Sequence, residues 1–242
     1  MSDKQQNDNT NNSSKDGVID FSKIKTGGKF LTTVVGTNKV FCKEAFSEEE
    51  RMIYDAMSDF ATNELLPLSK NELNKKDEKL IRKLVEQMGE LGFLGVDVPE
   101  KYGGSEMTKT GMCILAEGIS KSGSASFCTV WNVQTSIGSL GIIWYGNDEQ
   151  KQRWLPGISS GEKITAFGLT EPEAGSDATN SKTTGVLSDD GKHYILNGQK
   201  IFISNGAWAD LFTIALKIDG KFSSIVVEKG TPGFEIGKEE KK

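Results

Sequence analysis

The residues best suited to chemistry lie in one polar segment of the second half of the chain, AFGLTEPEAGSDATN. Thr170 and Ser176 supply hydroxyl groups there, and Gly175 lets a ligand approach the backbone closely. Hydroxyls and backbone amides near a turn can hold an electron-rich or anionic ligand. The carboxylates of Glu171 and Asp177 are expected to hold turns through backbone hydrogen bonds rather than to act as acids or bases.

Few other residues suggest acid–base or metal chemistry. His193, the only histidine, follows an Asp-Gly pair and has no partner nearby in sequence, so we expect a surface strand residue. Cys42, Cys113 and Cys128 lie far apart without CxxC spacing, which predicts neither a disulfide framework nor a metal site. The sequence also has no P-loop and no GxGxxG, so a Rossmann-type nucleotide site is not expected.

Length and composition limit the classes of protein that fit. The 242 residues, 36% of them hydrophobic, suffice for one large domain or two smaller ones. The formal net charge of -5 argues against nucleic acid as a partner, since phosphate binding needs clustered cations. The most apolar run, 131–145, holds too many polar residues for a transmembrane helix. Residues 1–40 are predicted to form a disordered or extended tail.

The elements that must position the polar segment begin with amphipathic helices. Ser47 and Glu50 form a capping-box pattern that predicts a helix closed by Pro67, and a second helix is expected to end at Gly92 in a left-handed cap. The predicted domain at 41–162 is therefore an all-helical bundle. Its further expected helices are 112–119, a buried 127–144, and a short helix from Asn147 through Trp154.

Beyond Gly161 the pattern changes to short runs rich in β-branched and aromatic residues, separated by turn pairs such as Asn197-Gly198 and Asp219-Gly220. We therefore expect 163–242 to form a small antiparallel β-barrel or sandwich, which makes the chain an α+β protein. The expected strands are ITAFGL, KTTGVL, HYILNGQKIFIS, LFTIALKI, SSIVVE and FEIG.

Several segments resemble signatures of the acyl-CoA dehydrogenase family. AFGLTEPEAGSDATN is similar to the first signature and departs from it at Asn180, where a small residue is usual. NGQKIFISNGAWAD resembles the family's flavin-contact hairpin, and VPEKYGG and YGNDEQKQRWLP resemble its helical domain. The resemblance extends from about Phe41 to the end and looks most like the long-chain and very-long-chain branch. It implies an N-terminal helical domain followed by a middle β domain that is incomplete.

The resemblance implies an FAD site built from both polar segments. Thr170 would reach the flavin ring and Ser176 would donate to the pyrophosphate, while Phe202 would pack on the ring and Ser204 would donate to flavin N5. For Thr170 and Ser204 the alternative is an ordinary strand hydroxyl, and for Gly175 a plain turn. The full implied cofactor set is Phe167, Leu169, Thr170, Gly175, Ser176, Phe202 and Ser204.

Substrate contacts are also implied, by Ser176 and by Trp131. Trp131 would line an acyl channel, although an apolar helix position of this kind is more often core. The implied reaction removes the α-proton of a fatty acyl-CoA with a glutamate and passes a hydride from the β-carbon to flavin, giving a trans-2-enoyl-CoA in fatty-acid β-oxidation.

The resemblance further implies electron-transfer flavoprotein as the electron acceptor and a homo-oligomer for the full-length protein. The location would be the mitochondrial matrix in a eukaryote or the cytoplasm in a bacterium. In the family the catalytic glutamate lies in a C-terminal four-helix domain, and this sequence ends at KEEKK before any such domain. We therefore expect a fragment without that domain and assign no general base.

Other interpretations stay open at this point. One is a non-catalytic remnant or interaction module that keeps the two front domains. Another is a flavin protein of the same fold, such as an acyl-CoA oxidase or a flavin-dependent monooxygenase. The TEPEAGSD form favours a dehydrogenase over the monooxygenases.

Overall fold

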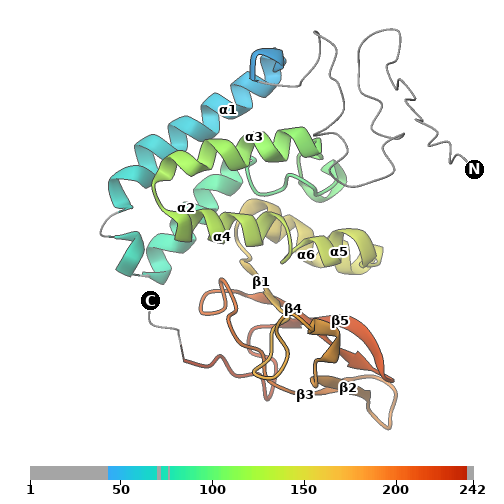
Figure 1. Cartoon of the computed structure of the whole chain (residues 1–242). Coiled ribbons are helices and arrows are strands. Elements are labelled where there is room, and N and C mark those ends of the chain that lie inside the picture. Colours follow the sequence, from blue (N-terminus) through green and yellow to red (C-terminus); the bar gives the residue numbers. More distant parts are fainter. Residues whose placement is uncertain (1–42, 70–71, 76, 239–242) are drawn as a thin grey trace, which may run out of the picture. The chain divides into compact units, whose positions relative to one another are not determined.

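The computed structural model describes residues 43–69, 72–75 and 77–238 (Figure 1). The chain divides into two compact units, Met1–Glu49 and Glu50–Lys242. In the first unit the described part is a 3-10 turn, Lys43–Ala45, and the start of helix α1. The predicted tail at 1–40 and Cys42 lie outside the described residues. All contacts discussed below belong to the second unit.

The helices begin and end where local signals predict. Asp77, Thr108 and Ser124 cap their helices by accepting hydrogen bonds from backbone amides, and Asn147 forms a full capping box with Gln150. The helices are α1 (Glu48–Phe60, continued by a π-helical turn at Ala61–Leu65), α2 (Glu78–Glu90), α3 (Lys109–Ile119), α4 (Ala125–Thr135), α5 (Leu140–Tyr145) and α6 (Asp148–Ser160).

Several of the predicted helices differ in extent from the observed ones, and α3 begins at Lys109 rather than at residue 112. The run expected as one helix over 127–144 is broken into α4 and α5, because Ser136 leaves the helical conformation and Gly138 turns the chain against Thr165. A Cβ on Gly138 would lie 2.3 Å from Thr165 Oγ1, so this approach requires glycine. The last helix continues past Trp154 to Ser160 and ends at Gly161, whose φ is 82°.

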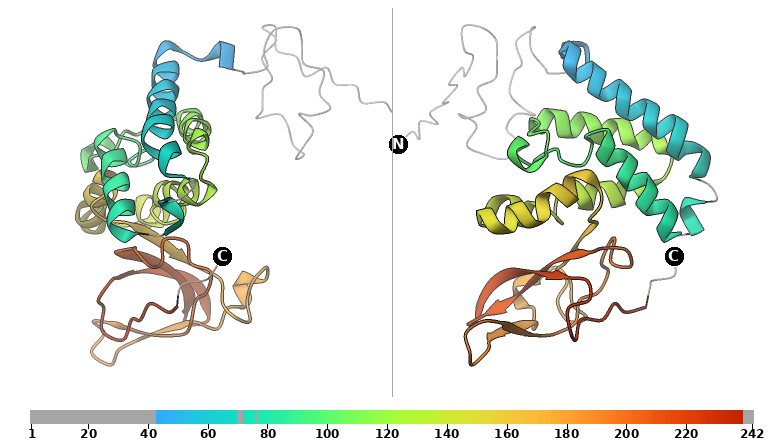
Figure 2. Two further views of the ribbon diagram at one scale, coloured as in Figure 1. Left: turned by 90° about the vertical axis from the view of Figure 1, so that its left-hand side faces the viewer. Right: turned by 180° about the vertical axis from the view of Figure 1, so that it is seen from behind.

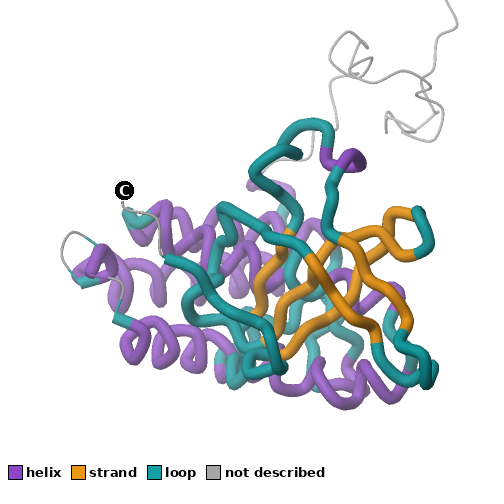
Figure 3. Tube along the Cα trace, turned by 90° about the horizontal axis from the view of Figure 1, so that it is seen from below, coloured by secondary structure: helices purple, strands orange, loops and turns teal. Residues whose placement is uncertain are grey.

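The sheet is mixed and open, whereas an antiparallel barrel or sandwich was expected. Its order is β1-β4-β2-β3, with β5 also pairing with β4. Figure 3 shows the strands gathered on one side of the helices. β4 runs parallel to both β1 and β2, and only β2–β3 and β4–β5 are antiparallel. The strands are β1 (Thr165–Gly168), β2 (Thr184–Leu187), β3 (Tyr194–Asn197), β4 (Leu211–Ile218) and β5 (Lys221–Glu228).

The length of the connections explains this difference. Tight turns at Asp190-Gly191 and Asp219-Gly220 fold two adjacent strand pairs into hairpins. The long connections 169–183 and 198–210 let the following strand lie parallel to an earlier one. The second half of the run expected as HYILNGQKIFIS belongs to one of these loops, and the expected strand FEIG is also loop.

Polar groups fix the start of β1 against the helices. The amide of Gln134, at the end of α4, donates to the carbonyls of Ile158 and Lys163 and accepts from the backbone N–H and hydroxyl of Thr165. Arg82 on α2 binds Asp210 at 3.0 Å just before β4. Figure 2 shows α6 leading directly into β1. The helical region and the sheet are thus held together by directional bonds as well as by packing.

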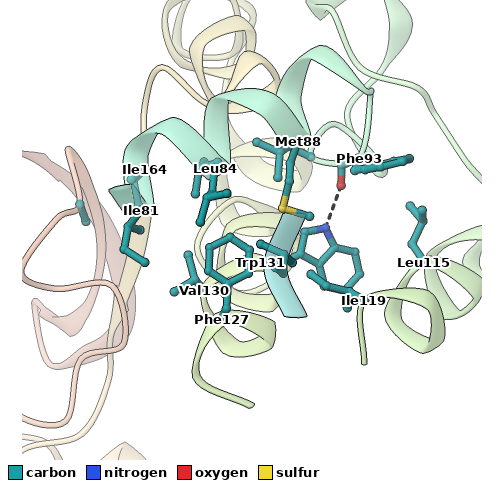
Figure 4. Close-up of a cluster of buried hydrophobic side chains, with 14 of the residues drawn as sticks. Ile81, Leu84, Met88, Phe93, Leu115, Ile119, Phe127, Val130, Trp131 and Ile164 are labelled. Atoms are coloured by element: carbon teal, nitrogen blue, oxygen red, sulfur yellow. Dashed lines mark hydrogen bonds between the residues drawn. The ribbon is translucent and has the colours of Figure 1, made fainter. Parts of the chain in front are cut away.

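The hydrophobic core surrounds Trp131 of α4, which is 2% exposed (Figure 4). Its indole N–H donates to the backbone carbonyl of Phe93 at 2.9 Å, and apolar side chains from the other helices enclose the ring. The same core continues to Ile164 and Phe212 at the sheet. The role expected for Trp131 as a lining of an acyl channel is replaced by the core role, since no face of the ring is open.

Trp131→Phe should lower the free energy of unfolding by about 1–3 kcal/mol, because the buried Phe93 carbonyl loses its donor. Urea denaturation monitored by far-UV circular dichroism measures the loss. Trp144→Phe, at a position 59% exposed, is the matched control and should change stability by less than about 0.5 kcal/mol. Equal effects of the two substitutions would contradict the structural role of the Trp131 indole.

Candidate functional site

A groove of about 310 Å³ opens where β1 ends and the chain turns away from the sheet. One wall comes from the end of α4 and the turn that follows it, with Val133 and Ile137, and another from β1 and the residues after it. The loop before β4 closes the groove with Ile201, Phe202, Ile203 and Ser204. Of the residues expected to bind a cofactor, the groove brings together Phe167, Leu169, Thr170, Phe202 and Ser204.

The groove combines apolar walls with a few hydrogen-bonding groups. Thr170 and Ser204 are its hydroxyl-bearing residues, and the other side chains on its wall are aliphatic or aromatic. The wall that follows β1 and the loop before β4 are joined by a hydrogen bond of 2.8 Å from the Ile201 amide to the Thr170 carbonyl. An apolar slot with a small number of convergent polar groups suits a flat, largely aromatic ligand with a polar edge.

Phe202 adopts a backbone conformation that is costly for an aromatic residue. Its φ is 58°, in the left-handed region, and its side chain is 70% exposed beside the groove. Such a conformation costs about 1–2 kcal/mol for a residue with a Cβ, and exposure gives no compensating burial. Strain of this kind concentrates at ligand sites, where it presents a side chain in a fixed place.

Asn205 holds the strained loop in place through hydrogen bonds of its side chain. Its φ is 64°, which Asn tolerates better than most residues, and its side-chain amide donates to the carbonyls of Val130 and Thr165. These bonds tie the loop both to α4 and to the first residue of β1. The three walls of the groove therefore share one buried polar attachment.

The other expected site residues lie apart from the groove. Gly175 and Ser176 are exposed on the turn that follows Thr170 and Glu171, where their backbone and hydroxyl groups face solvent. Asp177, also exposed, accepts a hydrogen bond from Thr179 and holds this turn. His193 is exposed immediately before β3, and its backbone N–H donates to Ser188.

Glu171 is buried in a cluster of hydrogen-bond donors next to the groove. Its carboxylate, with the side chain 3% exposed, accepts from the amides of Lys182 and Thr183, the hydroxyl of Thr183, and the ammonium of Lys200 at 2.7 Å. Burial alone would raise the pKa of Glu171, but the Lys200 ammonium, the Thr183 hydroxyl and the two amides lower it to about 2. The group is therefore a fixed anion at neutral pH.

Lys200 is the site residue that the sequence did not single out. Its partner lies 29 residues away along the chain, and its neighbours read as strand residues. The only local signal was a lysine between the Asn197-Gly198 turn and the apolar residues that begin at Ile201. A residue of that type is normally assigned to an exposed strand face, so its burial could not be anticipated.

The described residues give no sign of a metal centre or of a membrane span. No group of three or more His, Cys, Asp or Glu within them is placed to hold a metal ion. No helix in this part of the chain has the length and apolar character needed to cross a bilayer. Of the cysteines in the described part of the chain, Cys113 and Cys128 carry no disulfide.

Fold and site together define a class of protein in which a helical region and a small mixed sheet enclose an apolar slot. Residues 47–162 match the family description "Acyl-CoA dehydrogenase, N-terminal domain", and residues 166–242 match "Acyl-CoA dehydrogenase, middle domain". The chain belongs to the acyl-CoA dehydrogenase family.

Individual relatives agree with this assignment. A probable acyl-CoA dehydrogenase of Bacillus subtilis is 43% identical over 220 residues, which cover 90% of this chain and 36% of the relative. The very long-chain specific acyl-CoA dehydrogenase of Macaca fascicularis is 40% identical over 163 residues, or 63% of this chain and 25% of that protein.

Among solved structures, an acyl-CoA dehydrogenase of Bacillus anthracis complexed with FAD superposes with a TM-score of 0.83 at 43% identity. The match covers 89% of this chain and 37% of the other. The chain thus spans little more than a third of the length of these two Bacillus relatives.

The depressed pKa of Glu171 predicts a specific dependence of stability on pH. The carboxylate stabilises the fold fully above its ordinary pKa of 4.5, and this contribution, about 3 kcal/mol, is lost as pH falls toward about 2. Urea titrations between pH 6 and pH 2.5 should show a shallower loss for Glu171→Gln, which is already less stable at pH 7. Glu173→Gln, at an exposed neighbouring carboxylate, should keep the wild-type slope. An unchanged slope in Glu171→Gln would contradict the assignment.

Proposed function

We propose that this chain forms the flavin-ring site of an FAD-dependent acyl-CoA dehydrogenase that acts on fatty acyl-CoA. One observation carries the proposal: two segments far apart in sequence meet in an apolar groove whose few polar side chains are the hydroxyls of Thr170 and Ser204. The strained, exposed Phe202 at the same groove adds support, because no burial of its side chain in the fold offsets the strain of its backbone.

The residues fit a flavin in size and chemistry. Phe167, Leu169 and Phe202 offer apolar surface to a ring system, and Thr170 and Ser204 offer donors to its polar edge. Gly175 and Ser176 stand on an exposed turn, which suits contact with the pyrophosphate. FAD, when bound, would supply the acceptor for the hydride removed from the acyl chain. The role of this chain's own residues is to bind and orient.

The substrate and electron acceptor are part of the same proposal. Fatty acyl-CoA is the proposed substrate, supported by the match to the acyl-CoA dehydrogenase family. Electron-transfer flavoprotein is the proposed acceptor, and a homo-oligomer the proposed assembly of the whole protein. No described residue is assigned as the general base, since Glu171 is held as an anion by Lys200 and Asp177 holds a turn.

The purified chain should bind FAD, and Phe202→Gly should weaken binding by about tenfold or more through loss of stacking on the ring. Glycine accepts a positive φ without strain, so Phe202→Gly should be no less stable than the wild type. FAD titration by flavin fluorescence, with thermal melts alongside, measures both. Asp219→Gly is the matched control, since it also relieves a positive φ, of 50°, away from the groove. It should leave FAD affinity unchanged.

Substrate is tested by adding butyryl-, octanoyl- and palmitoyl-CoA to the flavin-loaded protein and following loss of flavin absorbance. Bleaching by any of the three, transferable to electron-transfer flavoprotein, supports the acyl-CoA proposal and would contradict the expectation that this chain has no general base. A purified chain that binds no FAD would favour the alternative of a non-catalytic remnant.

A further inference from the structure

Lys200 reaches across the chain rather than out to solvent. Its side chain is 8% exposed, and its ammonium donates both to the carbonyl of Leu169 at 3.0 Å and to the carboxylate of Glu171 at 2.7 Å. Leu169 lies on the wall of the groove, and Lys200 directly precedes Ile201 on the opposite wall. One buried cation therefore joins both walls.

Two glycines make room for this arrangement. The aliphatic part of Lys200 passes over Gly168, where a Cβ would lie 3.3 Å from Lys200 Cγ and 2.7 Å from Ile214 Cδ1. Gly198 lies so close to Thr183 that a Cβ would be 2.3 Å from its hydroxyl oxygen. Thr183 in turn donates to Glu171, so these glycines allow three stretches of chain to converge on one carboxylate.

The charges of this cluster have no role in a flavin contact as proposed above. A buried ion pair adds little net stability compared with apolar residues of similar volume, because desolvation offsets most of the attraction. The pair does fix the orientation of the Lys200 side chain, because the ammonium must point at both of its acceptors. A device of this kind fixes geometry rather than strengthening the fold.

We infer that the Lys200–Glu171 pair is the positioning element of the groove, setting the separation between the Leu169–Thr170 wall and the Ile201–Ser204 wall at the width that a flat ring requires. This inference rests on the proposed function for the identity of the ring. Neither member of the pair lines the groove. Lys200 is therefore a positioning residue, and it acts on the groove through the hydrogen bond between Ile201 and Thr170.

The test uses Lys200→Met, Glu171→Gln and the double variant in the full 242-residue chain. Each single variant leaves one buried group unpaired and should be destabilised, whereas the double variant has no unpaired charge and should recover stability. Hydrogen exchange of the Ile201 amide, measured by NMR without flavin, reports the spacing of the walls. It should accelerate by about tenfold or more in Lys200→Met and stay fast in the double variant.

FAD affinity is the second readout and should fall in parallel, again without recovery in the double variant. Arg82→Met is the matched control, because it also removes an ion pair between distant segments, and neither Arg82 nor Asp210 lines the groove. It should lower stability while leaving Ile201 exchange close to the wild-type rate.

The outcomes separate this inference from the proposed function. A stable double variant with wild-type Ile201 exchange and FAD affinity overturns the positioning role, even if the wild type binds FAD. Acceleration of Ile201 exchange equal to that in Arg82→Met also overturns it, since the effect would then be general loosening. If the wild type binds no FAD while Ile201 exchange responds as expected, the spacing role stands and the flavin proposal fails.

Discussion

The position of β1 depends on the buried side-chain amide of Gln134, and the rest of the site depends on β1. This amide uses two donors and one acceptor oxygen to join the end of α4, the end of α6 and the first residue of the strand. A buried amide is stable only when its hydrogen-bonding capacity is met. These hydrogen bonds therefore fix the position at which β1 begins. They also fix the positions of the groove residues that follow β1 along the chain.

Around the groove the protein gives up stability for the presentation of specific groups. Phe202 keeps an aromatic side chain exposed on a left-handed backbone, and Lys200 and Glu171 keep full charges out of water. Each arrangement persists because neighbouring bonds over-determine it, such as those that Asn205 makes to α4 and β1. These departures from the lowest local energy all lie within or beside the same groove, which is where a binding function would require them.

The mixed sheet serves this geometry. Parallel pairing sets the first residue of β4, Leu211, beside Thr165 at the start of β1, so the loop before β4 has to run back along β1 from its far end. On this path 201–204 lie beside 169–170, and the Ile201 amide bonds the Thr170 carbonyl. The long connections that carry the polar motifs are thus also the reason that the motifs meet.

The sequence by itself determined the local elements, the residue types at the site and the family. Helix ends at Gly92 and Asn147 follow from caps that involve residues only a few positions apart, and the motif hydroxyls are the basis for the flavin contacts proposed above. Tertiary structure alone decided that Trp131 is core, that α4 stops before Gly138, and that Lys200 meets Glu171. These outcomes join residues distant along the chain, and burial there depends on which surfaces pack together, which neither periodicity nor turn signals encode.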